Sequence, residues 1–92
     1  MKVTVEYAAQ IKRAAGVSRD ELEFESDVTL AGVFSRIFEL RGESLQGTLF
    51  TEDGCVHSSI LVFVGDTQVR DAENHPVPDG SVITFLSPIS GG

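Results

Sequence analysis

The sequence predicts an α+β domain in which one main helix packs on one face of a mixed sheet. Three observations lead to this fold class: several segments with strand-like alternation, one strongly amphipathic segment, and no internal repeat or linker. The 92 residues, of which 41% are hydrophobic, are enough for one modest core without a metal or disulfide. We expect residues 1–86 to form one folded unit and residues 87–92 to form a flexible tail.

Two segments near the N-terminus have the two-residue period of strands with one buried face. The first covers residues 2–7, where every second side chain is apolar, and the second covers residues 21–26, where glutamates alternate with Leu22 and Phe24. Residues 8–16 between them could form a helical turn, but they are too few to be stable alone. This connection is interpreted as a structured loop.

The main helix is predicted to begin after Thr29, whose hydroxyl can cap it, and to cover residues 30–41. Gly42 fits the position just beyond a helix end. Gly32 in the first turn weakens the isolated helix, so its stability depends on tertiary packing. An apolar stripe on one side of this helix is expected to cover the sheet and consists of Leu30, Val33, Phe34, Ile37 and Phe38.

Residues 43–58 are harder to assign. The pair Asp53-Gly54 is a turn signal, and the segment fits a small hairpin or a long loop equally well. Residues 60–64 form a β-branched and aromatic run that predicts a strand, and a short edge strand is expected at 67–70.

The last part of the chain contains turn signals followed by a final strand. Pro76 and Pro78 are expected to exclude regular structure, and Pro78-Asp79-Gly80 matches a type I turn with proline second and glycine fourth. Residues 82–86 are predicted to be the last strand of the sheet.

Charge and composition exclude several classes of function. A net charge of −7 repels phosphate backbones, so nucleic acid is not expected as a partner. No apolar run approaches the ~20 residues of a membrane span, and the N-terminus lacks the features of a signal peptide, so a cytoplasmic protein is expected. The single Cys55 cannot form an internal disulfide, and only two histidines accompany it, which is too few for a four-ligand zinc site.

The last two apolar strands have apolar residues on both faces, although the predicted fold has its helix on only one. An antiparallel sheet with one wet face usually alternates with polar residues, so the pattern predicts an apolar patch for a partner. Phe63, Ile83 and Phe85 are the candidates, whichever of them the helix leaves open. The alternative is that residues 43–58 cover the patch. The packing side chains would then be Leu45, Leu49 and Phe50.

The two glycines Gly91 and Gly92 follow an extended segment directly after the final strand. Glycine at both positions lets backbone pass through a channel too narrow for a Cβ atom. The carboxylate of Gly92 could then enter the active site of another protein and be activated there. The alternative is a frayed terminus whose glycines have no function.

The chain resembles molybdopterin synthase small subunits and related sulfur carriers of the MoaD/ThiS type. The resemblance covers nearly the whole chain, and its tail includes Pro88, Ile89 and Ser90 before the two glycines. It implies the β-grasp fold of ubiquitin. The other matching segments are Val3-Thr4-Val5-Glu6-Tyr7-Ala8-Ala9-Gln10, the helix after Thr29, the strand Ile60 to Val64, and Asp79-Gly80-Ser81-Val82.

The resemblance also implies a function and a set of partners. In that family a ubiquitin-activating-type adenylyltransferase uses ATP to adenylate the terminal glycine, and a sulfur donor, a sulfurtransferase or cysteine desulfurase, converts it to a thiocarboxylate. The tail then enters the large subunit of molybdopterin synthase. Gly92 matches the acceptor and Gly91 its companion, while Pro88, Ile89 and Ser90 would contact the partner. The chain itself would not bind ATP, because its basic residues are scattered and no glycine loop could cradle phosphates.

Other pathways remain open. Gly65-Asp66 replaces the Asn-Gly or Asn-Asp that the family commonly has after this strand, and the segment 43–58 is longer than in compact thiamine-pathway carriers. Carriers for thiamine, cysteine synthesis or tRNA thiolation are therefore alternatives. A ubiquitin-like modifier joined to lysines through Gly92, or a plain interaction module, would represent a different class.

Two further groups of residues could imitate catalytic or metal sites. Cys55 and His57 would share one side of a strand, but no third group accompanies them, and ordinary loop residues are the simpler interpretation. An acidic run alternates with Leu22 and Phe24, so it is interpreted as the solvated face of a strand. The run consists of Asp20, Glu21, Glu23, Glu25 and Asp27.

Overall fold

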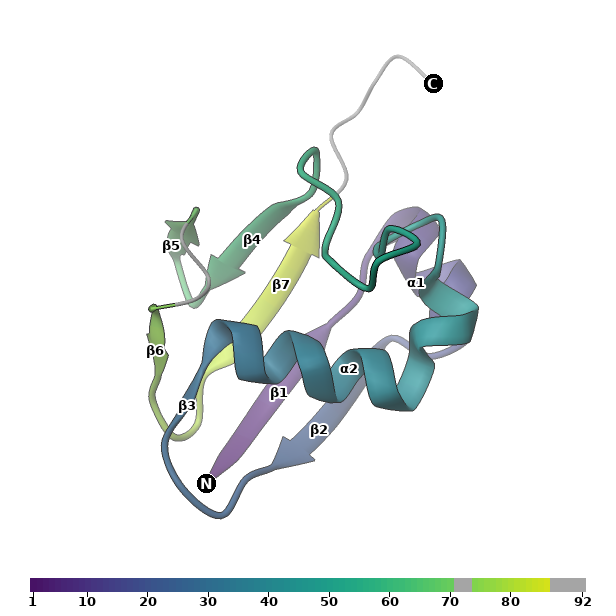
Figure 1. Cartoon of the computed structure of the whole chain (residues 1–92). Coiled ribbons are helices and arrows are strands. Elements are labelled where there is room, and N and C mark those ends of the chain that lie inside the picture. Colours follow the sequence, from purple (N-terminus) through teal and green to yellow (C-terminus); the bar gives the residue numbers. More distant parts are fainter. Residues whose placement is uncertain (71–73, 87–92) are drawn as a thin grey trace.

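A five-stranded mixed sheet forms the body of the protein, with the strand order β2-β1-β7-β4-β5 (Figure 1). The computed structural model describes residues 1–70 and 74–86, so the predicted tail at 87–92 lies outside the described residues. The central strands β1 and β7 run parallel, and every other neighbouring pair is antiparallel. The strands are β1 (Lys2–Glu6), β2 (Arg19–Glu23), β4 (Leu61–Val64), β5 (Thr67–Val69) and β7 (Val82–Leu86).

Helix α2 (Leu30–Leu45) lies across one face of this sheet, as predicted for the main helix (Figure 1). Its N-terminus is capped by Thr29, whose hydroxyl accepts from the backbone N–H of Gly32 at 3.4 Å. This arrangement of a mixed sheet and one main helix is the β-grasp fold, so the predicted fold class is confirmed. In the described residues, neither helix is long and apolar enough to cross a membrane.

The predicted end of this helix at Gly42 is wrong. The helix bends at Arg41, where φ is −137° and ψ is 15°, and continues to Leu45. Gly42 is used for close packing, because a Cβ atom built on it would lie 2.9 Å from the ring of Phe38. Leu45 is fully buried, so core packing carries the chain one turn beyond the expected stop.

The segment interpreted as a loop at 8–16 is a helix, α1 (Ala9–Ala15). Gly16, with φ of 81°, ends it by donating its N–H to the carbonyl of Lys12 at 3.0 Å. Ile11 and Ala15 are buried against the core. Seven residues are too few for a helix alone, so it is tertiary burial that stabilises this one.

The bounds of one strand also differ from the expectation. Strand β2 covers Arg19–Glu23, so it begins two residues earlier and ends three residues earlier than predicted, and its register pairs Leu22 with Val3. Phe24 follows the strand, and the guanidinium of Arg36 lies 4.6 Å from the centre of its ring.

A second, two-stranded sheet joins β3 (Val28–Thr29) to β6 (Pro76–Val77). Regular structure near Pro76 was not expected, but a strand that pairs on one side tolerates a missing N–H. The following turn is also displaced by one residue, because Ser81 donates its N–H to the carbonyl of Pro78 at 3.1 Å. Gly80 then occupies the third position with φ of 83°, as a type II turn requires.

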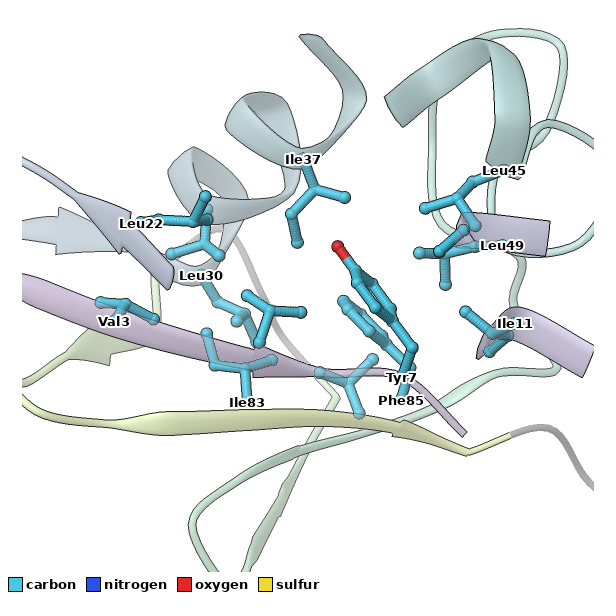
Figure 2. Close-up of a cluster of buried hydrophobic side chains, with 14 of the residues drawn as sticks. Val3, Tyr7, Ile11, Leu22, Leu30, Ile37, Leu45, Leu49, Ile83 and Phe85 are labelled. Atoms are coloured by element: carbon cyan, nitrogen blue, oxygen red, sulfur yellow. The ribbon is translucent and has the colours of Figure 1, made fainter. Parts of the chain in front are cut away.

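The core lies between the sheet and α2, and the segment after α2 contributes to it. Phe50 forms isolated bridges to Gln46 and Val56, so this segment is a loop with bridges and not a regular hairpin. Leu45 and Leu49 lie opposite Ile11 in the same cluster as the sheet residues (Figure 2). The described core therefore occupies one side of the sheet only.

Candidate functional site

The end of strand β7 is the described part of the candidate site, because the predicted sulfur-accepting tail follows it directly. The strand ends at Leu86. The predicted acceptor Gly92, its companion Gly91, and the predicted partner contacts lie outside the described residues. Those contacts are Pro88, Ile89 and Ser90.

The register of β4 and β7 determines which apolar side chains face the helix. Val62 is opposite Phe85, and Val64 is opposite Ile83, in the antiparallel pair. Ile83 and Phe85 are both 0% exposed, so the prediction that they belong to a docking surface is wrong. They point into the core because β1 places Val5 beside Ile83, and alternate residues share a face.

Phe85 is held between two other aromatic rings. Its centroid lies 6.5 Å from that of Tyr7, nearly parallel, and 5.6 Å from that of Phe34. Its neighbour Leu86 points to the opposite face of the sheet and is 37% exposed. The point from which the tail departs is thus anchored on the core side and apolar on the other.

In residues 1–70 and 74–86, the face opposite α2 carries an exposed apolar surface. Leu61 is the Cα partner of Leu86, and Phe63 is the partner of Thr84 on the same face. Leu61 is 38% and Val82 37% exposed, and Phe63 is partly exposed. We define the open apolar patch as Leu61, Phe63, Val82 and Leu86.

The alternative, in which residues 43–58 cover this patch, is wrong. Leu45, Leu49 and Phe50 are fully buried, but they pack into the cluster beneath α2. Phe50 meets the ring of Phe38 edge-on at 5.1 Å, which draws the loop toward the helix. The open apolar patch keeps its exposure in the described part of the chain.

The remainder of the open face is polar. On β1 and β2, the outward residues pair Lys2 with Glu23, Thr4 with Glu21, and Glu6 with Arg19. The apolar half of the face is therefore confined to β7 and β4, and Leu61 and Leu86 bring it to the end of β7. An apolar area with a polar border is typical of a protein interface.

A hydrogen-bonded cluster that sequence analysis missed joins both helices to the sheet. Asp20 accepts from the hydroxyl of Tyr7 at 2.7 Å and from Nη2 of Arg41 at 2.7 Å, and it also accepts from Nε of Arg41. Arg41 donates in addition to the carbonyl of Ala15 at the end of α1, at 3.3 Å. These bonds connect the end of β1, strand β2, and both helices.

The same cluster changes the ionisation of its members. The hydrogen bonds from Arg41 hold the pKa of Asp20 below its ordinary value, while burial and the bond to Asp20 raise the pKa of Tyr7. Asp20 is thus not part of a uniformly solvated acidic face. The one sequence signal was its position two residues before Leu22, on the inward side of the strand.

The other candidate residues show no arrangement for catalysis. Cys55 is exposed and His57 half-buried in the loop after α2, and neither lies in a strand. Glu21 and Glu23 lie exposed on β2. Within residues 1–70 and 74–86, no three His, Cys, Asp or Glu side chains are grouped closely enough to hold a metal ion.

Comparison with known proteins assigns the chain to a family. The model of the ThiS family matches residues 5–92, and the chain belongs to that family. No curated protein sequence gives a significant match.

Three solved structures illustrate the similarity of fold. SAMP1 from Haloferax volcanii is 17% identical, with all of both chains covered and a TM-score of 0.85. The putative molybdopterin converting factor subunit 1 from Pyrococcus furiosus is 22% identical over 97% of this chain and 99% of its own, with a TM-score of 0.73. The complex of subunits 1 and 2 of the molybdopterin-converting factor from Helicobacter pylori includes a chain that is 23% identical, with full coverage of both and a TM-score of 0.69. The protein therefore has the ubiquitin-like β-grasp fold of sulfur carriers.

Proposed function

We propose that the protein is a sulfur carrier that forms a thiocarboxylate at Gly92 and delivers its sulfur as the small subunit of a molybdopterin synthase. One observation carries this proposal: in a ThiS-family β-grasp chain, the Gly91-Gly92 pair follows shortly after the last strand of the sheet. The catalytic pocket belongs to larger partners. The chain acts as substrate and subunit together.

The proposed chemistry needs no catalytic side chain from this protein. A carboxylate oxygen of Gly92 attacks the α-phosphorus of ATP in the activating enzyme, and pyrophosphate leaves. The resulting acyl adenylate is an activated electrophile, unlike the free carboxylate. Hydrosulfide attacks its carbonyl carbon, AMP leaves with the electrons of the broken C–O bond, and the S–H proton passes to solvent. The product is the thiocarboxylate.

The open apolar patch supports a role as a subunit. Leu61 and Leu86 lie at the end of β7 from which the tail departs, and Phe63 and Val82 continue the patch along the strands, so a partner that holds the tail would also cover the patch. The Helicobacter pylori relative is described in complex with its subunit 2. We assign the patch to the large subunit and, in an earlier step, to the activating enzyme.

A second candidate function is protein modification through Gly92. The structures of SAMP1 from Haloferax volcanii, a small archaeal modifier protein, favour this candidate, because one of them matches this chain with a TM-score of 0.85. A modifier would leave a Gly-Gly remnant on target lysines, whereas a dedicated carrier would not.

Mass spectrometry tests the proposal directly. The protein is incubated with ATP, the cognate activating enzyme and sulfide, and the intact mass is measured. The proposal expects one sulfur in place of one oxygen, located at Gly92 by fragmentation. Lysine conjugates without any thiocarboxylate would overturn it in favour of a modifier. The absence of both products would exclude both functions.

A further inference from the structure

Helix α1 carries a basic surface that the proposed chemistry does not use. Lys12 and Arg13 are both exposed, and Arg19 follows α1 at the start of β2, also exposed. These three residues, which we call the basic corner, are three of seven cationic side chains in a chain with a net charge of −7. Positive charge is thus concentrated in a short segment of an acidic protein.

Two of the three cations of the basic corner, Lys12 and Arg13, have no acidic neighbour on their own element, whereas Arg19 is the cross-strand partner of Glu6 on β1. Helix α1 contains no acidic residue, so neither Lys12 nor Arg13 has a partner along the helix. Among the described residues, the one ion pair joins Arg41 to Asp20, and Arg36 is engaged by Phe24 and the carbonyl of Glu23. A shallow depression beside the two cations has no acidic lining residue. It is lined by Ala9, Lys12, Arg13, Gly16, Val17 and Ser18.

The topology places this corner at the same end of the sheet as the tail. Strands β1 and β7 run parallel, with Val5 beside Ile83, so the segments that follow them leave from one edge. The chain enters α1 after β1 (Figure 1). Tyr7, just after β1, stacks on Phe85 near the end of β7 (Figure 2). A protein that takes up the tail therefore passes close to α1.

We infer that the basic corner is a docking surface for an acidic segment of the activating enzyme that takes up the tail. The inference rests on the proposed function and names the chemistry of the partner at that site. Charges within a Debye length, about 10 Å at 0.1 M salt, attract an oppositely charged surface. Such attraction raises association rates by roughly 10- to 1,000-fold and weakens as salt is added. The corner would thus offset the repulsion that the acidic body of the carrier imposes on an acidic partner.

A structural explanation competes with this one. Cations in the last turn of a helix interact favourably with its dipole, and Lys12 and Arg13 are so placed. That role requires the charges for folding but predicts no dependence of partner binding on them. The two explanations are separated by measuring binding and stability on the same variants.

The first arm of the experiment uses hexaglutamate peptide as the probe and follows backbone amide shifts by NMR in the full chain at low salt. We expect saturable shifts at Lys12, Arg13 and Arg19 that disappear in the double variant Lys12→Gln/Arg13→Gln. Absence of these shifts in the unmodified chain, or their persistence in the variant, would overturn the inference. This arm does not depend on sulfur chemistry.

The second arm measures pyrophosphate release by the cognate activating enzyme. The variant Lys12→Glu/Arg13→Glu should raise KM about 10-fold or more at low salt, with kcat unchanged and the difference lost near 1 M salt. The single reversals Arg13→Glu and Arg70→Glu form the matched pair, because each reverses one exposed charge; Arg13→Glu should raise KM, while Arg70→Glu, just after β5, should leave KM nearly unchanged. An equal rise in both variants would indicate a general charge effect and refute the docking surface.

The outcomes also separate this inference from the proposed function. If the unmodified protein releases no pyrophosphate with the enzyme, the proposed function fails, and the peptide titration alone decides whether the corner binds an acidic segment. If pyrophosphate is released but the charge reversal leaves KM unchanged, the proposed function stands and the assignment of the docking surface is wrong. The Gln variants keep helix-compatible side chains, so unchanged unfolding midpoints confirm that the fold is intact.

Discussion

Phe63 and Phe85 lie on neighbouring strands but on opposite faces of the sheet, and truncating each should separate binding from stability. Phe85 is 0% exposed and packed between Tyr7 and Phe34. Phe85→Ala should therefore cost about 3–5 kcal/mol of unfolding free energy. The total unfolding free energy of a domain of this size is roughly 5–14 kcal/mol, so this loss should lower Tm by roughly 20 °C. Partner binding by the remaining folded protein should change little.

Phe63→Ala should have the reverse effects, a small loss of stability and a large loss of partner affinity. This ring is partly exposed on the open apolar patch, so its truncation should cost only about 1 kcal/mol of stability. A central interface anchor contributes about 2 kcal/mol or more, so the Kd for the large subunit or the activating enzyme should rise roughly 30-fold. Chemical denaturation and isothermal titration calorimetry measure the two effects. The argument is refuted if Phe63→Ala loses as much stability as Phe85→Ala while partner affinity stays the same.

Three further predictions concern the hydrogen-bonded cluster, the tail and the cysteine. Asp20→Asn should destabilise the protein at neutral pH, and its deficit against the unmodified protein should shrink as pH falls through the lowered pKa of Asp20, because the stabilising carboxylate is then protonated. Urea midpoints from neutral pH to roughly pH 2 measure this, and a deficit that is constant across that range would contradict it. Deleting Gly92 should abolish the sulfur gain seen by mass spectrometry and leave Tm unchanged, whereas an equal loss of thermal stability would show that the residue belongs to the folded body. Cys55→Ser should accept sulfur at an undiminished rate, since Cys55 is exposed in a loop, and a sulfur adduct that maps to Cys55 would reject the carrier mechanism.

The elements that could be predicted are those specified by local interactions. Strand β1 follows from its two-residue period, and the start of α2 follows from the hydroxyl of Thr29, which caps the first turn. Elements that depend on distant contacts were missed. Helix α1 is held by the burial of Ile11 and Ala15, and α2 passes Gly42 because Leu45 is buried.

The Asp20 cluster shows the same limit for polar residues. The sequence analysis assigned Asp20 to a solvated acidic face, but the structure places it on the inward side of β2, where a carboxylate is stable only if it accepts hydrogen bonds. The donor, Arg41, is 21 residues away in the chain. No local pattern specifies such a pair, so the acidic run appeared uniform until the fold joined α2 to β2.

The identity of the open face could not be decided from periodicity, because alternation divides a strand into two sets without saying which set is buried. In β4 and β7 both sets are apolar, and the pairing of Val5 with Ile83 determines which set faces the core. If β4 and β7 both shifted by one residue against β1, every side chain on them would move to the other face of the sheet. Phe63 would then be buried in place of Val62, and Phe85 would point outward. Strand β1 prevents this exchange, since its outward residues are polar and its inward residues apolar, so only one register buries Ile83 and Phe85 beside it. The same pairing that completes the core therefore leaves four apolar side chains exposed on the face away from α2 in the described part of the chain, where a partner can bind them: Leu61, Phe63, Val82 and Leu86.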